Sequence, residues 1–403
     1  MAKYPNLYSE IKVGGVTLKN RIVMPPMGTN YANVDGTITP RMIEYNTERA
    51  RGGVGLIIVE ASTVDYPRGR STLGQPTINN EKDIPRWLEL TDKVHAYGTK
   101  IICQIIHAGF TTTPEMSGGF ENVTATDTDE FELVGFTCNK SRALTTEEVD
   151  EMVGKFVKAA VIAKRGGLDG VEVHAAHGYL LNQFLSPLTN KRTDKFGGSI
   201  ENRALIVTSI IKGIREACGE NFLISVRIPG KDYIPGGITL EDSAVIAKLL
   251  EDAGADLISI SVGYYYTIAD PCETQERCEG YRLYLAEAIK PKIKKARLLT
   301  AGKILRPEMA ESVIAKGTAD LVAMGRQIIC DPFWPAKVEE GREEEIRRCL
   351  SCNQGCLGNM FGTQSGVRCV INPYVGFEER YRESFTPRAS SPKKVVVAGG
   401  GIA

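Results

Sequence analysis

The hydrophobic positions of this chain fall into short runs separated by longer amphipathic stretches. Eight runs rich in Val, Ile and Leu predict strands at 21–24, 54–60, 100–106, 170–174, 223–227, 257–262, 298–301 and 321–324. Most of these runs are apolar at consecutive positions, which is typical of parallel strands buried on both faces. Between them, apolar residues recur at helical spacing and predict helices at 40–51, 84–97, 147–165, 200–218, 240–253 and 307–316.

Helix start signals support two of these segments. Thr39 precedes Pro40, and Thr145 precedes a pair of glutamates, as expected for capping and first-turn positions. Eight evenly spaced strand–helix units in the first 340 residues predict an α/β fold in which a (β/α)8 TIM barrel closes on itself. An open doubly wound sheet is the alternative, but the even spacing favours closure.

Two connections are too long to be plain turns. Residues 110–144 follow the third predicted strand, and residues 263–280 follow the sixth and begin with Gly263-Tyr264-Tyr265-Tyr266. In a barrel, both connections leave strand C-termini, the face on which active sites lie. We therefore expect them to form a lid or a substrate wall rather than idle surface insertions.

Four cysteines near the end of the chain carry a specific chemical signal: Cys349, Cys352, Cys356 and Cys369, spaced C-x2-C-x3-C-x12-C. No apolar leader follows Met1, so we expect a cytoplasmic protein whose thiols stay reduced rather than forming disulfides. Structural zinc usually takes two matched C-x2-C pairs, whereas three clustered ligands and a distant fourth suit a 4Fe-4S cluster. The other six cysteines are scattered, and we interpret them, including Cys272 and Cys278, as structural.

Composition excludes several classes of partner. The 49 basic and 49 acidic residues cancel, so charge gives no basis for binding nucleic acid or an anionic membrane. No apolar stretch approaches the length needed to span a bilayer. The remaining interpretation is a globular enzyme that acts on a small molecule. No pattern in the sequence specifies its oligomeric state.

The predicted organisation has four parts. Residues 1–340 form the barrel, 341–373 bind the cluster, 374–392 form a charged, proline-containing linker, and 393–403 begin another domain. The last part contains a Val-Val-Val-Ala run followed by Gly399 and Gly401, similar to the first strand and glycine-rich turn of a Rossmann-like domain. We therefore expect the chain to be a fragment that ends at the start of a FAD- or NAD(P)-binding domain.

Two of the four histidines lie three residues apart, at the end of the fourth predicted strand. These are His174 and His177, and Tyr179 follows them. Ring N–H groups from both histidines can converge on one substrate oxygen and stabilise negative charge there. Tyr179 is a candidate proton donor. The alternative is a hydrogen-bonded structural pair, and a metal site lacks an evident third ligand.

Polar residues at other strand ends indicate a cofactor. Gln104 and His107 end the third strand and Arg227 ends the fifth. An amide can read a uracil-like edge, and a cation can stabilise a reduced, anionic ring. Gly302-Lys303 and Gly325-Arg326 follow the last two strands, where barrels commonly bind a phosphate. Together these positions predict a phosphorylated cofactor.

The chain resembles the Old Yellow Enzyme family of flavoproteins over essentially its whole length. The matching runs are Lys19-Asn-Arg-Ile-Val-Met-Pro-Pro-Met27, Gln104-Ile-Ile-His-Ala-Gly109, His174-Ala-Ala-His-Gly-Tyr-Leu-Leu-Asn-Gln-Phe-Leu-Ser-Pro187, Arg192-Thr-Asp…Phe-Gly-Gly-Ser-Ile-Glu-Asn-Arg203 and Met324-Gly-Arg326. The four-cysteine segment is similar to the 2,4-dienoyl-CoA reductase and 2-enoate reductase branch. Members of that branch carry FMN in the barrel, a 4Fe-4S cluster, and FAD- and NAD(P)H-binding domains.

The resemblance implies roles for the candidate residues. It implies an FMN lined by Pro26, Met27, Gly28, Ala61, Gln104, Arg227, Gly302, Gly325 and Arg326. Lys303 joins this predicted cofactor site because it follows Gly302 at the end of the seventh strand. His174 and His177 would hold the activating oxygen of an α,β-unsaturated carbonyl, enoate, enoyl-CoA or steroid-like substrate. FMN N5 would deliver hydride to the β-carbon, and Tyr179 would protonate the α-carbon. Electrons would run from NAD(P)H through FAD and the cluster to FMN.

One departure and two rivals qualify this assignment. Similar dienoyl-CoA reductases often place a histidine after the sixth strand, where this chain has Gly263-Tyr264-Tyr265-Tyr266, so an enone, enoate or steroid fits about as well. An amine dehydrogenase or demethylase of the trimethylamine dehydrogenase type has the same parts. That enzyme attaches FMN through a cysteine just after the first strand, and Met27-Gly28-Thr29-Asn30 offers none. A non-catalytic electron carrier is the third hypothesis.

Overall fold

The computed structural model describes residues 3–133, 136–264, 267, 272–382, 391–394, 396, 398 and 399. Most of the expected Rossmann strand and glycine-rich turn lies outside these residues, as do Tyr265 and Tyr266. Within the described part of the chain, no helix is long and apolar enough to cross a membrane.

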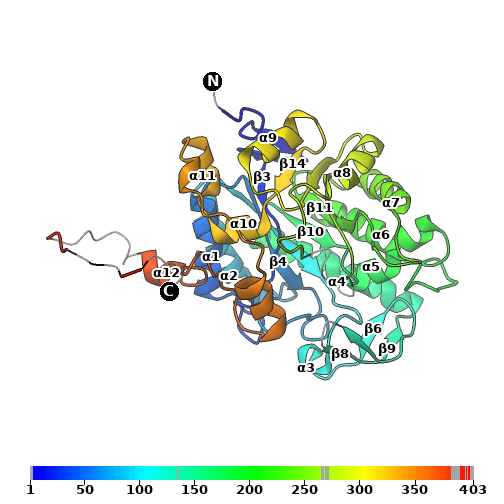
Figure 1. The fold of residues 1–403 in the computed structure, drawn as a ribbon. Helices are drawn as coiled ribbons and strands as arrows, with labels where there is room; N and C mark the ends of the chain where they lie inside the picture. The colour runs from blue at the N-terminus through cyan, green and yellow to red at the C-terminus, as the bar shows by residue number, and fades with distance from the viewer. Residues whose placement is uncertain are drawn as a thin grey trace.

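Eight parallel strands close into a barrel at the centre of the molecule (Figure 1). The strand order is β10-β11-β12-β13-β14-β3-β4-β5, and pairing of β10 with β5 completes the circle. The strands are β3 (Ile22–Met24), β4 (Leu56–Thr63), β5 (Lys100–Ile106), β10 (Gly170–His174), β11 (Leu223–Pro229), β12 (Leu257–Ser261), β13 (Arg297–Thr300) and β14 (Leu321–Ala323). The prediction of a (β/α)8 barrel is therefore confirmed.

Helices cover the outside of the barrel, each following its strand. They are α1 (Pro40–Arg51), α2 (Ile84–His95), α4 (Thr146–Arg165), α6 (Ile200–Cys218), α7 (Leu240–Ala253), α8 (Leu283–Ile289), α9 (Pro307–Ala315) and α11 (Trp334–Glu339). The predicted caps are present: Thr39 Oγ1 accepts the N–H of Met42, and Thr145 forms a capping box with Glu148. The short helices α8 and α11 were not predicted.

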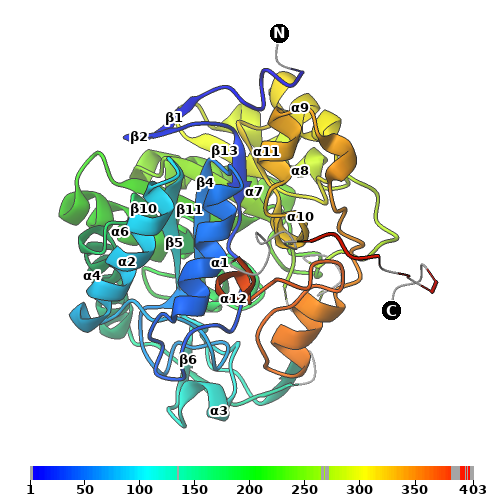
Figure 2. The same cartoon turned by 90° about the vertical axis from the view of Figure 1, so that its left-hand side faces the viewer.

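A hairpin closes one end of the barrel, formed by β1 (Ile11–Val13) and β2 (Val16–Leu18). Val13 and Leu18 are fully buried and pack in one cluster with inward-facing side chains of the barrel strands. The turn is the pair Gly14-Gly15, with Gly14 at a φ of +55°. Figure 2 shows the hairpin at the opposite end of the barrel from the insertion that contains β6. The hairpin thus covers one end of the barrel and does not cover the C-terminal ends of the strands.

The C-terminal end of the barrel is covered by connections and by the segment that follows α11. The insertion after β5 contains α3 (Pro114–Ser117), β6 (Asn122–Thr124), β7 (Phe131–Leu133), β8 (Phe136–Cys138) and β9 (Ser141–Ala143). Short helices at this end are α5 (Leu180–Leu185) and α10 (Gly325–Cys330), and a single turn at Glu81–Asp83 leads into α2. Another single turn, Lys290–Lys292, follows α8 and leads into β13. The final segment contains a turn at Glu343–Glu345, a π-helix at Gln354–Gly362 and α12 (Glu378–Arg382).

The first part of the expected linker packs against the barrel instead. Helix α12 lies beside α1 (Figures 1 and 2), where Glu378 forms a buried ion pair with Arg49. The guanidinium carbon of Arg368 lies 4.1 Å from the centre of the Phe377 ring. At least one charged residue of the segment 374–382 is therefore paired with the barrel. Residues 383–390 lie outside the described part of the chain.

Candidate active site

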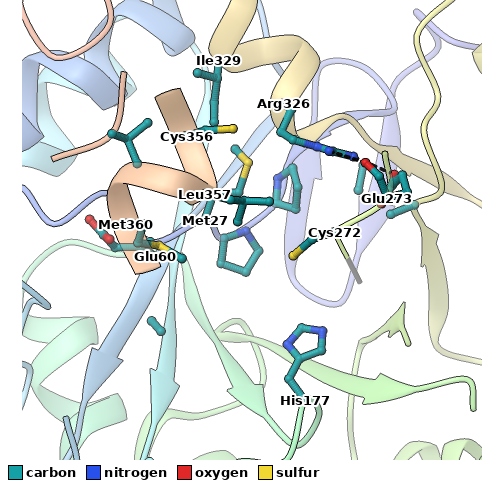
Figure 3. Close-up of a pocket in the computed structure, with 18 of the residues that line it drawn as sticks. Met27, Glu60, His177, Cys272, Glu273, Arg326, Ile329, Cys356, Leu357 and Met360 are labelled. Atoms are coloured by element: carbon teal, nitrogen blue, oxygen red, sulfur yellow. Dashed lines mark hydrogen bonds and ion pairs between the residues drawn. The ribbon is translucent and has the colours of Figure 1, made fainter. Parts of the chain in front are cut away.

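A cavity opens at the C-terminal end of the barrel, among residues drawn from nearly every strand end (Figure 3). It is lined by all ten positions predicted to bind the cofactor: Pro26, Met27, Gly28, Ala61, Gln104, Arg227, Gly302, Lys303, Gly325 and Arg326. The same cavity is lined by His174, His177 and Tyr179. The fold thus brings the predicted cofactor residues and the predicted catalytic residues to one place.

One side of the cavity offers groups that fit an isoalloxazine ring. Gln104 Nε2 donates to Glu172 Oε1 at 2.8 Å, so the amide oxygen is the atom that Gln104 can offer to a ring N–H. Ser225 Oγ donates to the second oxygen of Glu172 at 2.9 Å. Burial raises the pKa of Glu172, and the charge of Arg227 opposes that shift. Arg227 also supplies a positive charge beside a ring that is anionic when reduced.

The opposite side of the cavity fits a phosphate. Arg282 and Arg326 share the carboxylate of Glu273, at 2.8 and 3.1 Å, so these three side chains together carry a net positive charge. Gly325 starts α10 directly after β14, and a Cβ at this position would lie 2.9 Å from Met27 Sδ. The absence of a side chain therefore keeps the backbone open to a ligand here. The donor set as a whole fits FMN.

Lys303 lines the cavity, but its ammonium group bonds to the connection after β12. Its backbone is at a φ of +56°, and its Nζ donates to the carbonyl oxygens of Thr274, Gln275 and Arg277 at 3.2, 2.9 and 2.6 Å. The ammonium group therefore holds the connection after β12 in place rather than facing the phosphate side. Arg326 and the glycine backbone remain as the phosphate-binding candidates.

The two candidate histidines face each other. His174 ends β10, and His177 follows at a φ of +62°, a left-handed conformation that few residues with a side chain adopt. Their ring centres are 5.0 Å apart and nearly perpendicular, and His174 Nε2 lies 3.3 Å from His177 Nδ1. Burial, reinforced by the charge of Arg227, lowers the pKa of both rings well below the usual value. Both imidazoles are therefore neutral at pH 7.

Tyr179 completes the wall that the histidines begin. It is the N-cap residue of α5, is 5% exposed, and meets the His174 ring edge-on with a centre-to-centre distance of 5.0 Å. The structure therefore gathers the three predicted catalytic residues on a single wall. Tyr264, expected in an aromatic substrate wall, instead packs on Gly178 and is 1% exposed.

Among the other residues that line the cavity, Glu60 and Cys272 carry ionisable groups that the sequence analysis did not assign to the site. The Glu60 carboxylate, near the end of β4, accepts hydrogen bonds from the N–H and Oγ1 of Thr29, and burial raises its pKa to about 7. Cys272, interpreted from the sequence as structural, lies across the cavity from His177 (Figure 3). Its carbonyl oxygen accepts from Asn353 Nδ2 at 2.8 Å. The sequence offered one signal for Glu60, because it is a lone carboxylate in an otherwise apolar predicted strand. For Cys272 the only signal was its position after the sixth predicted strand.

The four clustered cysteines surround a second, small cavity. It is lined by Cys349, Cys352, Cys356 and Cys369 together with the apolar side chains of Ile329, Leu350, Val370 and Ile371. All ten cysteines are free thiols, and among the described residues no three His, Cys, Asp or Glu side chains converge on one point. Zinc requires thiolates about 2.3 Å from a single centre, whereas a cubane cluster takes one thiolate at each iron. The four-thiol set fits a 4Fe-4S cluster better than zinc.

The two cavities share a wall. Residues that line both are Arg326, Ile329, Cys349 and Cys356. The wall is anchored to the barrel, because the N–H of Cys349 donates to Gln327 Oε1 of α10 at 3.0 Å. On the other side, the N–H of Val367 donates to the carbonyl of Thr29 at 2.9 Å. The cysteine segment is therefore part of the larger cavity, not a separate appendage.

Met360 extends this wall toward the first strand. Figure 3 shows it on the same helix as Cys356 and Leu357, facing the cavity. A Cβ built on Gly28 would lie 2.6 Å from Met360 Sδ, closer than real Cβ contacts come. Gly28 is therefore a position at which the missing side chain makes room for the cysteine segment.

Comparisons with known proteins agree with this geometry. Residues 6–345 match the profile of the NADH:flavin oxidoreductase / NADH oxidase family. An NADH oxidase of Thermoanaerobacter brockii is 46% identical over 403 residues, which cover 100% of this chain and 61% of that protein. A cinnamate reductase of Clostridium sporogenes is 36% identical over 424 residues, covering 100% and 62%. The chain thus spans about three fifths of the length of these curated relatives.

Solved structures are also similar. A 2-naphthoyl-CoA reductase in complex with 2-naphthoyl-CoA has a TM-score of 0.87 at 36% identity, covering 93% of this chain and 58% of that chain. A histamine dehydrogenase from Rhizobium sp. 4-9 has a TM-score of 0.85 at 26% identity, covering 93% and 53%. The similarity to both structures therefore extends over more residues than the barrel alone, and both proteins are longer than this chain.

Proposed function

Because the chain belongs to the NADH:flavin oxidoreductase / NADH oxidase family, we propose that it is the barrel and cluster part of a reductase of activated C=C bonds. The observation that carries the proposal is the wall formed by His174, His177 and Tyr179 in the cavity that fits FMN. One relative is named a cinnamate reductase and one similar structure a 2-naphthoyl-CoA reductase. Both names support a substrate whose double bond is conjugated with a carbonyl group.

In the proposed reaction, the residues of the protein bind the substrate and transfer a proton to it. FMN bound in the cavity would supply hydride chemistry. His174 and His177 bind the carbonyl oxygen of the substrate through neutral ring N–H groups and stabilise the negative charge that develops there. Tyr179 holds a proton on its phenolic oxygen and delivers it to the α-carbon. Cys272 lies on the facing wall of the cavity.

We extend the proposal to the source of electrons. The four cysteines hold a 4Fe-4S cluster, and the wall shared by the two cavities supports electron passage between cluster and flavin. We place the NAD(P)H and FAD sites outside this chain, which covers 61% and 62% of the length of two relatives. The whole enzyme would be an NAD(P)H-dependent ene-reductase of the 2,4-dienoyl-CoA and 2-enoate reductase type.

An anaerobic absorbance spectrum with iron and sulfide analysis tests this function. We expect one flavin and about four irons per chain, and reoxidation of the dithionite-reduced protein by one class among enones, enoates and enoyl thioesters. Zinc in place of iron would overturn the cluster assignment. Cofactors without any alkene response, combined with reduction of the flavin by an amine, would favour the amine dehydrogenase alternative.

Substitution of Tyr179 tests the proton-transfer role. Tyr179→Phe should slow substrate-dependent reoxidation by about 10²- to 10⁴-fold, the range for loss of a general acid, and should leave flavin and iron content unchanged. Stopped-flow absorbance of the reduced protein measures this rate. The matched control is Tyr45→Phe, which removes a buried phenolic oxygen that has no hydrogen-bond partner among the described residues and lies outside the cavity. A wild-type rate in Tyr179→Phe would show that the proton comes from elsewhere.

A further inference from the structure

We propose that Ser261 sets the tautomer of His177, so that Nδ1–H of His177 and Nε2–H of His174 form the oxygen-binding pair. The inference rests on the proposed function, because it concerns how that site holds a carbonyl oxygen. Ser261 ends β12, is 3% exposed, and is not among the described residues that line the cavity. It is therefore a positioning residue that acts through His177.

Two hydrogen bonds of Ser261 bear on the position of the proton of His177. Arg227 Nη2 donates to Ser261 Oγ at 3.2 Å, and a guanidinium group has no acceptor. Ser261 Oγ lies 2.6 Å from His177 Nε2. With one lone pair engaged by Arg227, Ser261 Oγ can still either donate its proton to Nε2 or accept from Nε2–H. We infer that it donates, because only this direction leaves a proton on Nδ1 of His177 for a substrate oxygen. A neutral imidazole carries a single N–H, so that of His177 lies on Nδ1.

A separate contact fixes the proton of His174. The backbone N–H of Ala176 donates to His174 Nδ1 at 3.4 Å, so the neutral ring carries its proton on Nε2. This nitrogen lies 3.3 Å from His177 Nδ1. Two N–H donors cannot bond to each other, but both can bond to one oxygen placed between them. That arrangement is the donor pair of an oxyanion hole, prepared before the substrate arrives.

The alternative tautomer has a different consequence. If Nε2 of His177 carried the proton, Ser261 Oγ would accept from both Arg227 and His177. His177 Nδ1 would then accept from His174 Nε2–H, and the histidine pair would satisfy itself. No N–H of the pair would be directed at a substrate oxygen. The burial-driven fall in the pKa of both histidines leaves each ring neutral, so the choice between these two tautomers decides whether the donors exist.

The tautomer can be measured directly in the oxidised, cofactor-loaded protein. We expect ¹⁵N NMR of histidine-labelled protein to show His177 protonated at Nδ1, with its signals assigned by their loss in His177→Asn. In Ser261→Ala the proton should move to Nε2. Affinity for a phenolate, a probe for the oxygen-binding pair, should fall by at least ~10-fold. Ser261→Thr keeps the hydroxyl and should keep both the wild-type tautomer and the affinity.

Ser259→Ala is the matched control. It removes another buried hydroxyl from β12, one that bonds to Glu172 instead of His177, and should change phenolate affinity by no more than about twofold. An equal loss of phenolate affinity in Ser259→Ala and Ser261→Ala would mean that the loss comes from altered packing of β12. That result would overturn the inference. Nε2-protonated His177 in the wild type, or unchanged ring signals in Ser261→Ala, would also overturn it. Failure of the proposed function would appear separately, as wild-type protein that no unsaturated carbonyl reoxidises.

Discussion

Glu60 illustrates, at the scale of single residues, how burial changes the chemistry of a carboxyl group. Burial raises its pKa from 4.5 to about 7, although the N–H and hydroxyl of Thr29 both donate to the carboxylate and oppose the shift. Between pH 4.5 and pH 7 the folded chain keeps a proton that the unfolded chain releases. The free energy of unfolding therefore falls as pH rises through this window, by about 3 kcal/mol from this residue.

The substitution Glu60→Gln should remove this dependence. Since Gln does not titrate, the wild type should lose about 3 kcal/mol of stability relative to the variant between pH 4.5 and pH 7. Urea unfolding at four pH values across the window measures the difference. The exposed substitution Glu115→Gln should instead track the wild type. Parallel curves for the wild type and Glu60→Gln would show that Glu60 titrates at its ordinary pKa.

Residues that follow directly from a strand end were predictable, and residues placed by loops were not. His174, Gln104 and Arg227 sit at C-terminal strand ends, and the fold of a parallel barrel alone brings such positions together. Cys272 and Lys303 take their directions from the path of the long connection after β12. No local pattern encodes that path, because it depends on carbonyl groups and side chains distant in the sequence.

Helices and strands also fall into those that could be predicted from the sequence and those that could not. The barrel strands and long helices were predicted because each buries a continuous apolar run or stripe, which is visible in the sequence. The hairpin of β1 and β2 was missed because each strand has only three residues. Helix α12 was missed for the opposite reason, since its sequence Glu-Glu-Arg-Tyr-Arg looks solvated and its burial depends on Arg49 of α1.

The ion pair that holds α12 should be important for stability. Arg49 is 0% exposed and Glu378 is 5% exposed, so Glu378→Gln leaves a buried cation without its counter-charge and should cost about 3–5 kcal/mol. The double variant Arg49→Met/Glu378→Leu should recover most of this loss, because no charge is then buried. Urea unfolding measures both. The control is Arg86→Ala, which breaks an exposed pair with Glu89 and should cost less than about 1 kcal/mol of stability. An equally small loss in Glu378→Gln would show that the buried ion pair does not stabilise the position of α12.

At the scale of the whole molecule, the shared wall allows the two cofactor sites to be separated by mutation. Cys369 lines only the smaller cavity, whereas Cys356 lines both. Cys369→Ser should therefore lose iron but retain FMN, and the dithionite-reduced flavin should still react with the alkene. Cys356→Ser should lower flavin content as well. Cys278→Ser, an exposed cysteine outside both cavities, should retain both cofactors.

Iron, sulfide and flavin analyses of the purified variants distinguish these outcomes. Loss of flavin in Cys369→Ser would mean that the cluster segment folds the flavin cavity only when the cluster is present. Retention of iron in Cys369→Ser would remove this cysteine from the ligand set. Either result would change how the two cavities depend on each other.

The close approach of Gly28 and Met360 also constrains the history of this fold. Any side chain at position 28 requires Met360 to move, since its sulfur would lie 2.6 Å from the new Cβ. A lineage that has already changed residue 360 can thus replace Gly28 more easily than one that keeps Met360. The cysteine segment therefore limits which side chains position 28 of the barrel can carry, although the two positions lie far apart in the sequence.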